Sequence, residues 1–219
     1  DRPVGYTRDR LLMVPRKSDE FYSKTAVLRD ELKKTGMVKE LAESGGQVTE
    51  VWSGNGGFDW QGKDPSFEAS FSTLSVSATF GNAVGWQFTD GRDFSEEFAS
   101  DSSGFILNEA AVKYMNIENP VGQIIHWKNS AYGVDKDFSI LGVIKDMVMK
   151  SPFEPVDPAV YFLQGWHGWL VIKIDPEVST SEALPQIESV FKKIIPSAPF
   201  EYRFADEEYK LKFIAEERV

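Results

Sequence analysis

The chain has 219 residues, of which 42% are hydrophobic and 26% are charged, with 24 Lys and Arg against 34 Asp and Glu. This length fits one large domain or two small ones of the ordinary ~100–200 residues, and the composition excludes disordered, collagen-like and low-complexity proteins. The net charge of −10 argues against binding to nucleic acid or to anionic lipid headgroups, because both need clustered Lys and Arg.

Cysteine is absent from the sequence. Its absence excludes thiol nucleophiles, disulfides and Cys-type metal sites, and it fits an oxidising compartment such as the bacterial periplasm. No apolar run approaches the ~20 residues that cross a bilayer, and no signal peptide is visible. Because the chain starts at Asp1 rather than Met and stops at Val219 in a charged, helix-like segment, we expect it to be a piece of a longer protein.

The first part of the chain predicts a strand followed by helices and a second strand. A short apolar run predicts a buried strand at residues 10–15. Ser18 is a suitable N-cap, and apolar residues at helical spacing predict an amphipathic helix that ends near Gly36. We expect a second short helix at residues 37–44, closed by two glycines, and a strand at residues 47–52.

The middle of the chain predicts mostly strands. Residues 53–65 are rich in turn-forming residues and predict a loop, whereas residues 66–80 predict one long strand or two. Asn108 is placed to cap a short helix at residues 109–115. Further strands are expected at residues 105–107, 123–128 and 138–145, the last two joined as a hairpin.

The last part repeats the order of the first. Ser179 and Glu182 form a capping box at the start of a helix that stops at Pro196. Strands are expected at residues 160–163, 169–174 and 200–204, and a final helix at residues 206–219. Right-handed βαβ units from the two ends, placed side by side, form one sheet with helices on one face. The sequence therefore predicts an α+β fold in which the mostly-β middle is an inserted subdomain.

Residues suited to catalysis or metal binding are few. The two histidines, His126 and His167, occur in no metal-binding spacing, so we interpret both as structural or surface residues. The composition does not exclude a metal site made of two histidines and a carboxylate, nor a pair of catalytic carboxylates. No nucleophile elbow, Walker loop or dinucleotide fingerprint occurs, and the glycine-rich residues 54–57 predict a flexible loop.

Two further groups of side chains are candidates for binding. Five acidic residues lack the alternating spacing of a calcium loop and predict a solvated acidic loop; they are Asp90, Asp93, Glu96, Glu97 and Asp101. Six tryptophans are present, and the segment from Trp166 to Trp169 is the best candidate for an exposed aromatic cluster that binds a sugar or a partner. The alternative is that these rings cover the edges of the core.

An ordered set of short motifs resembles the periplasmic core domain of MacB-like ABC transporter permeases, a family with an FtsX-type membrane region. The motifs are Gly91-Arg92-Asp93-Phe94-Ser95, Ile106-Leu107-Asn108-Glu109-Ala110-Ala111-Val112, Asn119-Pro120-Val121-Gly122-Gln123, Ile140-Leu141-Gly142-Val143-Ile144-Lys145-Asp146 and Pro199-Phe200-Glu201-Tyr202-Arg203-Phe204. The resemblance is densest between residues 89 and 162. The loop at residues 53–65 and the turn at residues 164–169 match no motif of the family.

The resemblance implies a porter-like subdomain made of residues 1–80 and 151–219, with a sabre-like subdomain inserted at residues 81–150. It also implies a non-enzymatic, extracytoplasmic domain on the periplasmic side of the inner membrane, without catalytic, cofactor-binding or metal-binding residues. The implied partners are its own transmembrane helices, a separate ATPase subunit or domain, a second permease copy and a periplasmic adaptor protein. The competing hypotheses are a free-standing secreted module that binds glycans or proteins, and an enzyme that uses a carboxylate pair.

Overall fold

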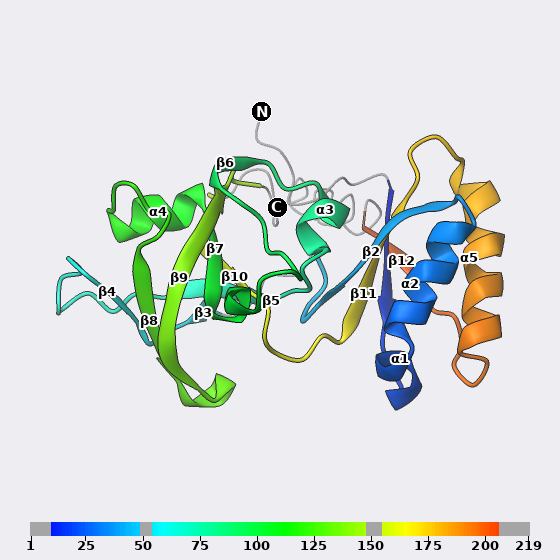
Figure 1. The fold of residues 1–219 in the computed structure, drawn as a ribbon, viewed down its shortest axis with the longest axis horizontal. Coiled ribbons are helices and arrows are strands. Elements are labelled where there is room, and N and C mark those ends of the chain that lie inside the picture. Colours follow the sequence, from blue (N-terminus) through cyan, green and yellow to red (C-terminus); the bar gives the residue numbers. More distant parts are fainter. Residues whose placement is uncertain (1–9, 49–53, 148–154, 206–219) are drawn as a thin grey trace, which may run out of the picture.

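The computed structural model describes residues 10–48, 54–147 and 155–205, and these residues form two sheets that lie side by side (Figure 1). We call them the small sheet, which has four strands and carries helices on one face, and the large sheet, which is curled and mixed. This arrangement confirms the predicted α+β fold.

The small sheet has the strand order β12-β1-β11-β2, with antiparallel pairing between all neighbours. Its strands are β1 (Leu11–Pro15), β2 (Val38–Ser44), β11 (Trp169–Ile174) and β12 (Arg203–Phe204). Because β11 lies between β1 and β2, these two strands run parallel and form a split βαβ unit. The sequence segments at the two ends of the chain thus build one sheet, as the strand–helix–strand order predicts.

Three helices belong to the small sheet, and Figure 1 shows α2 and α5 side by side on one of its faces. They are α1 (Asp19–Ser23), α2 (Thr25–Lys34) and α5 (Thr180–Ile194). The predicted capping by Ser179 is confirmed, since its side chain accepts a hydrogen bond from the Glu182 amide at 3.2 Å. Aliphatic side chains such as Leu12, Leu28 and Ile187 fill the space between sheet and helices.

The helix predicted at residues 37–44 is wrong, because these residues form strand β2. Apolar residues at positions 38, 41 and 42 fit a helical spacing as well as an edge strand. The chain breaks from α2 at Gly36, which has a φ of +76°, and then pairs with β11 from Val38 to Ser44. Tertiary pairing has therefore overridden the local pattern.

The large sheet has the order β3-β5-β10-β7-β9-β8-β4, and β6 also pairs with β9. Its strands are β3 (Gly54–Asn55), β4 (Phe58–Trp60), β5 (Phe71–Ser75), β6 (Phe88–Gly91), β7 (Gly104–Asn108), β8 (Ile124–Asn129), β9 (Val134–Ile144) and β10 (Ala159–Phe162). Helix α4 (Glu109–Met115) and the 3₁₀ turns η2 (Ala99–Ser103) and η3 (Ser130–Tyr132) lie against these strands, whereas helix α3 (Phe80–Val84) packs against β2 and β11 of the small sheet.

β3 and β4 stand at the two ends of this strand order, yet they follow one another in the chain and are separated only by Gly56 and Gly57. The large sheet must therefore curl so that its two end strands come close together. Gly57 has a φ of +91°, and a Cβ there would lie 1.9 Å from the Lys128 carbonyl oxygen. Aromatic rings fill the interior, among them Phe58 stacked on Trp127 with centroids 5.0 Å apart. Residues 53–65, predicted as a loop, thus contribute two short strands.

A third hydrophobic cluster joins the two sheets. It contains Leu11 and Val171 from the small sheet, Phe80 from α3, and Ile106 and Tyr161 from the large sheet. In Figure 1, α3 lies between the sheets, on the side of the small sheet away from α2 and α5. Since strand side chains alternate between faces, the small sheet uses one face for its helices and the other for the large sheet.

Other expectations have mixed outcomes. The strands at residues 123–128 and 169–174, the hairpin and the Asn108 cap are confirmed, and residues 66–80 contain one strand, β5. The strand at residues 200–204 shortens to β12. The helix at residues 206–219 and most of the strand at residues 47–52 lie outside the described residues. Subdomain boundaries at residues 80 and 151 stay a prediction, although β3–β5 and β10 pair within the large sheet.

Candidate functional site: a polar junction between the sheets

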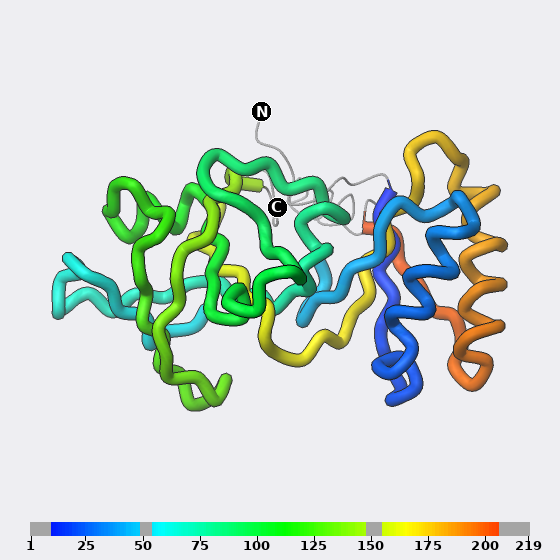
Figure 2. The backbone as a smooth tube through the Cα atoms, viewed as in Figure 1, coloured from blue at the N-terminus to red at the C-terminus, as the bar shows by residue number. Residues whose placement is uncertain are grey.

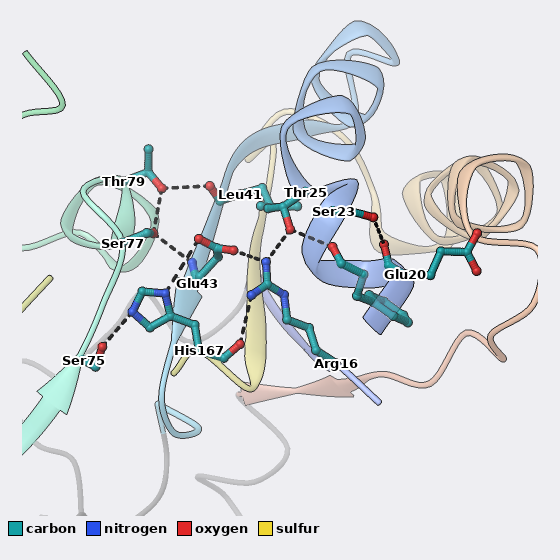
Figure 3. Close-up of polar contacts among 11 residues, drawn as sticks. Arg16, Glu20, Ser23, Thr25, Leu41, Glu43, Ser75, Ser77, Thr79 and His167 are labelled. Atoms are coloured by element: carbon teal, nitrogen blue, oxygen red, sulfur yellow. Dashed lines mark hydrogen bonds and ion pairs between the residues drawn. The ribbon is translucent and has the colours of Figure 1, made fainter. Parts of the chain in front are cut away.

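The chain passes between the sheets twice, after β2 and again before β11 (Figure 2). A cluster of buried and half-buried polar groups lies where these passages meet, and we call it the polar junction. It consists of Arg16, Glu43, Ser75, Ser77 and His167 (Figure 3). Arg16 and Glu43 come from the small sheet, Ser75 ends β5, Ser77 follows it, and His167 belongs to the returning passage.

Arg16 holds the small-sheet side of the junction. Its guanidinium ion-pairs with Glu43, donates to the Thr25 hydroxyl, and donates to the His167 carbonyl oxygen at 2.9 Å. Its side chain is only 2% exposed. Burial lowers the pKa of Arg16, but a guanidinium stays charged in proteins, so the carboxylate and the carbonyl must replace its hydration shell.

His167 links this ion pair to the large sheet. The Ser75 hydroxyl donates to the Gln164 carbonyl at 2.8 Å, so its oxygen accepts from His167 Nε2, 2.7 Å away. Burial, and secondarily the positive charge of Arg16, lower the pKa of His167 to about 4. The imidazole is therefore neutral near pH 7, with its proton on Nε2.

The order Ser75, His167, Glu43 resembles a nucleophile–base–acid triad, but its geometry suits a structural link. The His167 Nδ1 to Glu43 Oε2 distance is 3.8 Å, too long for a hydrogen bond, and the Glu43 carboxylate is already held by Arg16. An imidazole with a pKa of about 4 is a weak base, and the Ser75 proton is directed at a backbone carbonyl. The same contacts fix the returning passage between both sheets.

Backbone hydrogen bonds run alongside these side chains. Ser44 and Val76 form an antiparallel bridge, the Gly45 amide donates to the Ser75 carbonyl at 2.8 Å, and the Ser77 amide donates to the Glu43 carbonyl at 2.9 Å. The Glu43 amide in turn donates to the Ser77 hydroxyl at 2.9 Å. The free edge of β2 is thus covered by the segment after β5, which prevents strand pairing with other chains there.

A second buried acid, Glu40, ties the same strand to helices on both of its faces. It accepts from Arg29 of α2 at 2.8 and 3.2 Å and from Asn82 of α3 at 3.0 Å. Burial opposes its ionisation, but these bonds and one from the Leu41 amide outweigh it and lower the pKa of Glu40. Glu40 and Glu43 therefore anchor the small sheet to α3 and to the polar junction respectively.

The residues singled out from the sequence are distributed over the molecule. His126 lies in β8, where its ring nitrogens are 2.7 Å from the carboxylates of Asp135 and Asp137, and hydrogen bonds to Asp137 first and Asp135 second raise its pKa. His167 is in the polar junction, far along the chain. Within the described residues, no group of three or more His, Asp or Glu is arranged to hold a metal ion.

The predicted acidic loop is solvated in part. Asp90, Glu96 and Glu97 are exposed, whereas Asp101 is fully buried and accepts hydrogen bonds from the two terminal nitrogens of Arg92, each at 2.8 Å. Burial raises the pKa of Asp93 to about 6. Asp101 thus fixes the loop rather than facing solvent.

Of the expected aromatic cluster, only Trp166 is well exposed, at 69%, because Trp169 packs into the core between the sheets. Trp60 and Trp127 are buried, and Trp52 lies outside the described residues. Gly54 and Asn55 form β3, and Gly56 and Gly57 join it to β4, so the glycine-rich residues close the large sheet.

Sequence reasoning did not find Arg16, Glu40, Glu43 or Ser75. No motif marks them, because their partners lie up to 151 residues away, as for Arg16 and His167. One feature of the sequence does point to these residues, because two glutamates lie within an apolar stretch at residues 38–44. Carboxylates buried in such a stretch need partners from elsewhere in the fold.

No protein-family model and no curated protein matches the chain. Among the solved structures that resemble it in fold are two domains of ABC-type transporters. The periplasmic region of MacB from Actinobacillus actinomycetemcomitans has a TM-score of 0.61 at 15% identity, covering 94% of each chain. The extracellular domain of the ABC-type transporter YknZ from Gram-positive bacteria has a TM-score of 0.56 at 13% identity, covering 89% of this chain and 98% of its own. The predicted resemblance to the periplasmic domain of MacB-like permeases is therefore confirmed as a resemblance of fold.

Proposed function

We propose that the chain is a non-catalytic extracytoplasmic domain of an ABC transporter permease, which couples ATP-driven movement to export or to another process of the cell envelope. The observation that carries this proposal is the fold match along 94% of both chains to the periplasmic region of MacB. No helix in the described part of the chain is long and apolar enough to cross a membrane.

The paths by which the chain enters and leaves the fold support this proposal. β1 begins at Leu11, β12 ends at Phe204, and the two strands are antiparallel neighbours with Leu12 opposite Phe204. The polypeptide therefore enters and leaves the small sheet at the same end. A domain inserted between two membrane helices needs this arrangement, because both helices lie on one side of it.

The junction between the sheets also supports a role in transmitting movement. A force applied to the small sheet reaches the large sheet without loss only if the two are stiffly connected. The shared hydrophobic cluster, the Ser44–Val76 bridge and the hydrogen bond between Ser75 and His167 provide such a connection. Packed interiors have low compressibility, so a displacement at one face carries to the other.

The proposal includes the organisation and partners that the resemblance implies. The porter-like subdomain consists of residues 1–80 and 151–219 and the sabre-like insertion of residues 81–150. The domain works with its own transmembrane helices, an ATPase subunit or domain, a second permease copy and a periplasmic adaptor. It needs no cofactor, and its catalytic chemistry is confined to the ATPase.

Spin-label distances in the intact transporter test this proposal, and the absence of cysteine from the chain makes single labelling simple. Val27 on α2 and Ile124 on β8 are 54% and 49% exposed, and cysteine at each position carries one label per sheet. We expect ATP to change the distance between labels on two permease copies and to leave the Val27–Ile124 distance within one copy unchanged.

Two results contradict the proposal. One is a gene that encodes no hydrophobic span on either side of this segment. The other is a label pair between copies that does not respond to ATP in a preparation that hydrolyses ATP.

A further inference from the structure

A polar cleft of about 450 Å³ opens beside the polar junction. One wall belongs to α1 and α2, with Tyr22, Ala26 and Asp30. The other residues that line the cleft include Ser77 and Thr79, between β5 and α3, and Glu96, in the acidic loop after β6. The cleft is therefore bounded by parts of both halves of the molecule.

Two of the acidic residues that line the cleft have no ion-pair partner among the described residues. Of the four charged residues that line it, Arg29 is paired with Glu40 and Glu43 with Arg16. Asp30 and Glu96 ion-pair with no other described residue. Both lie close enough to contribute to the raised pKa of Arg29, although the hydrogen bond to Glu40 is its main cause. Two carboxylates without an ion-pair partner in the described part of the chain thus line a cavity whose other polar groups are hydroxyls, the Arg29 guanidinium and the Glu43 carboxylate.

An aromatic pair stands at the rim of this cleft. Tyr22 lines the cleft, and its ring centroid is 6.3 Å from that of Trp166, which is 69% exposed. An indole this exposed is unusual on a folded surface and typical of an interface anchor. The cleft and its rim together offer an aromatic surface and negatively charged side chains, and this combination suits a cationic ligand.

The exposed indole packs over Gly168, next to a residue that hydrogen bonds hold. Next to it, the His167 carbonyl accepts from Arg16 at 2.9 Å and the His167 ring contacts Ser75 at 2.7 Å. Gly168 leaves the space that the indole occupies, because a Cβ there would lie 2.5 Å from the Trp166 ring. An anchor fixed before binding loses little conformational entropy when a partner arrives.

We propose that the cleft and its rim bind a basic polypeptide segment, with a Lys or Arg side chain in the cleft between Asp30 and Glu96 and the flanking chain packed over Trp166. The cleft holds one side chain, and Trp166 lies outside it, so the occupant must extend beyond a single amine. The proposal is independent of the transporter function, because a binding surface of this kind serves any extracytoplasmic protein.

The test is a titration of the isotopically labelled 219-residue chain with hexalysine, followed by ¹H–¹⁵N spectra. The Trp166 indole signal is assigned by its loss in Trp166→Phe. We expect saturable shifts of that signal and of amides in α2 and residues 77–79. Glu96→Gln weakens binding about fivefold, as expected for one exposed charge pair, and Trp166→Ala about tenfold.

The controls are Glu118→Gln and Ile124→Ala, which remove an exposed acid and an exposed apolar side chain from other parts of the surface and leave binding unchanged. Hexaglutamate causes no shifts. The proposal is overturned if hexalysine does not bind, if its shifts spread over the whole acidic surface, or if Glu96→Gln and Trp166→Ala bind as the unaltered chain does. Equal binding of spermidine also overturns it in favour of a small-amine site.

Discussion

The small and large sheets solve the same problem, closing a hydrophobic core, with different side chains. The small sheet packs against α2 and α5, and its core is mainly aliphatic. The large sheet curls on itself, and rings such as Phe58, Phe105 and Trp127 fill its interior. A helix brings its own side chains to a sheet, whereas a curled sheet must fill its interior from its own strands, which favours the largest residues.

The difference also shows in how each half is held to the other. Each sheet has a hydrophobic core of its own, and both also contribute side chains to the third cluster. Two units with separate cores unfold separately, whereas units that share one are expected to unfold together. The following predictions test how far the two halves depend on each other, beginning with the largest effect.

Removing the central ring of the large sheet tests whether its core supports the whole molecule. Trp127 is 1% exposed and contacts Phe58, Phe138 and Phe162. We expect Trp127→Ala to lower the free energy of unfolding by about 3–5 kcal/mol, because it leaves a large cavity. Denaturant unfolding followed by circular dichroism measures it. Val27→Ala, at an exposed position of α2, is the control and changes stability by less than about 0.5 kcal/mol.

The ion pair between Arg16 and Glu43 tests how much the small-sheet side of the polar junction contributes to stability. Arg16→Met leaves the Glu43 carboxylate without its partner, and we expect a loss of about 3 kcal/mol, the lower end for buried pairs because Glu43 is 24% exposed. Arg16→Met with Glu43→Leu removes both charges, and most of the stability returns. Thermal denaturation of the two variants and of Glu43→Leu completes a double-mutant cycle. Additive effects contradict a coupled pair.

The pH dependence of stability tests the buried state of His167. Its pKa is lowered to about 4, so the unfolded chain binds a proton near pH 6.5 that the folded chain does not. Stability therefore falls as the pH drops from about 6.5 to 4, by at most about 3 kcal/mol. The raised pKa of Asp93, about 6, acts in the opposite direction over part of this range.

Comparison with His167→Gln separates the two groups. The difference in unfolding free energy between this variant and the unaltered chain, measured at half-unit steps from pH 7 to pH 4, follows His167 alone. We expect the variant to lose less stability over this range. Equal slopes contradict a buried neutral imidazole.

The two helix caps give the smallest effects and compare the two halves directly. Asn108, in the large sheet, is buried and accepts from the Ala111 and Ala159 amides at 2.9 and 3.0 Å, whereas exposed Ser179 accepts from one amide of α5. We expect Asn108→Ala to cost about 2 kcal/mol and Ser179→Ala about 0.5–1 kcal/mol. Chemical denaturation measures both, and equal costs contradict the additional structural role of Asn108.

The sequence predicts the small sheet and its long helix better than it predicts the large sheet. Ser179 and residues 169–174 carry local signals, a cap and an apolar run, and both are confirmed. The curl of the large sheet depends on pairings such as Phe58 with Trp127, which no local pattern encodes. For the same reason the sequence does not reveal the polar junction, since Arg16 and His167 are 151 residues apart in the chain.

Strand β2 shows how two levels of information compete. Its apolar spacing fits a helix, but Glu40 and Glu43 are tolerated there only because Arg29 and Arg16 reach them from other elements. A single sequence carries no information on such distant pairs. The resemblance to a known family indicates the fold, but only the structure shows which distant side chains pair.

Native-state hydrogen exchange tests most directly the claim that the two sheets form one mechanical unit. The slowest amides of the β1–β11 ladder and of the β8–β9 ladder report the opening free energies of the small and large sheets. We predict equal opening free energies with the same dependence on denaturant. Values that differ by more than about 2 kcal/mol, with different denaturant slopes, contradict a single unit and show that the halves open separately.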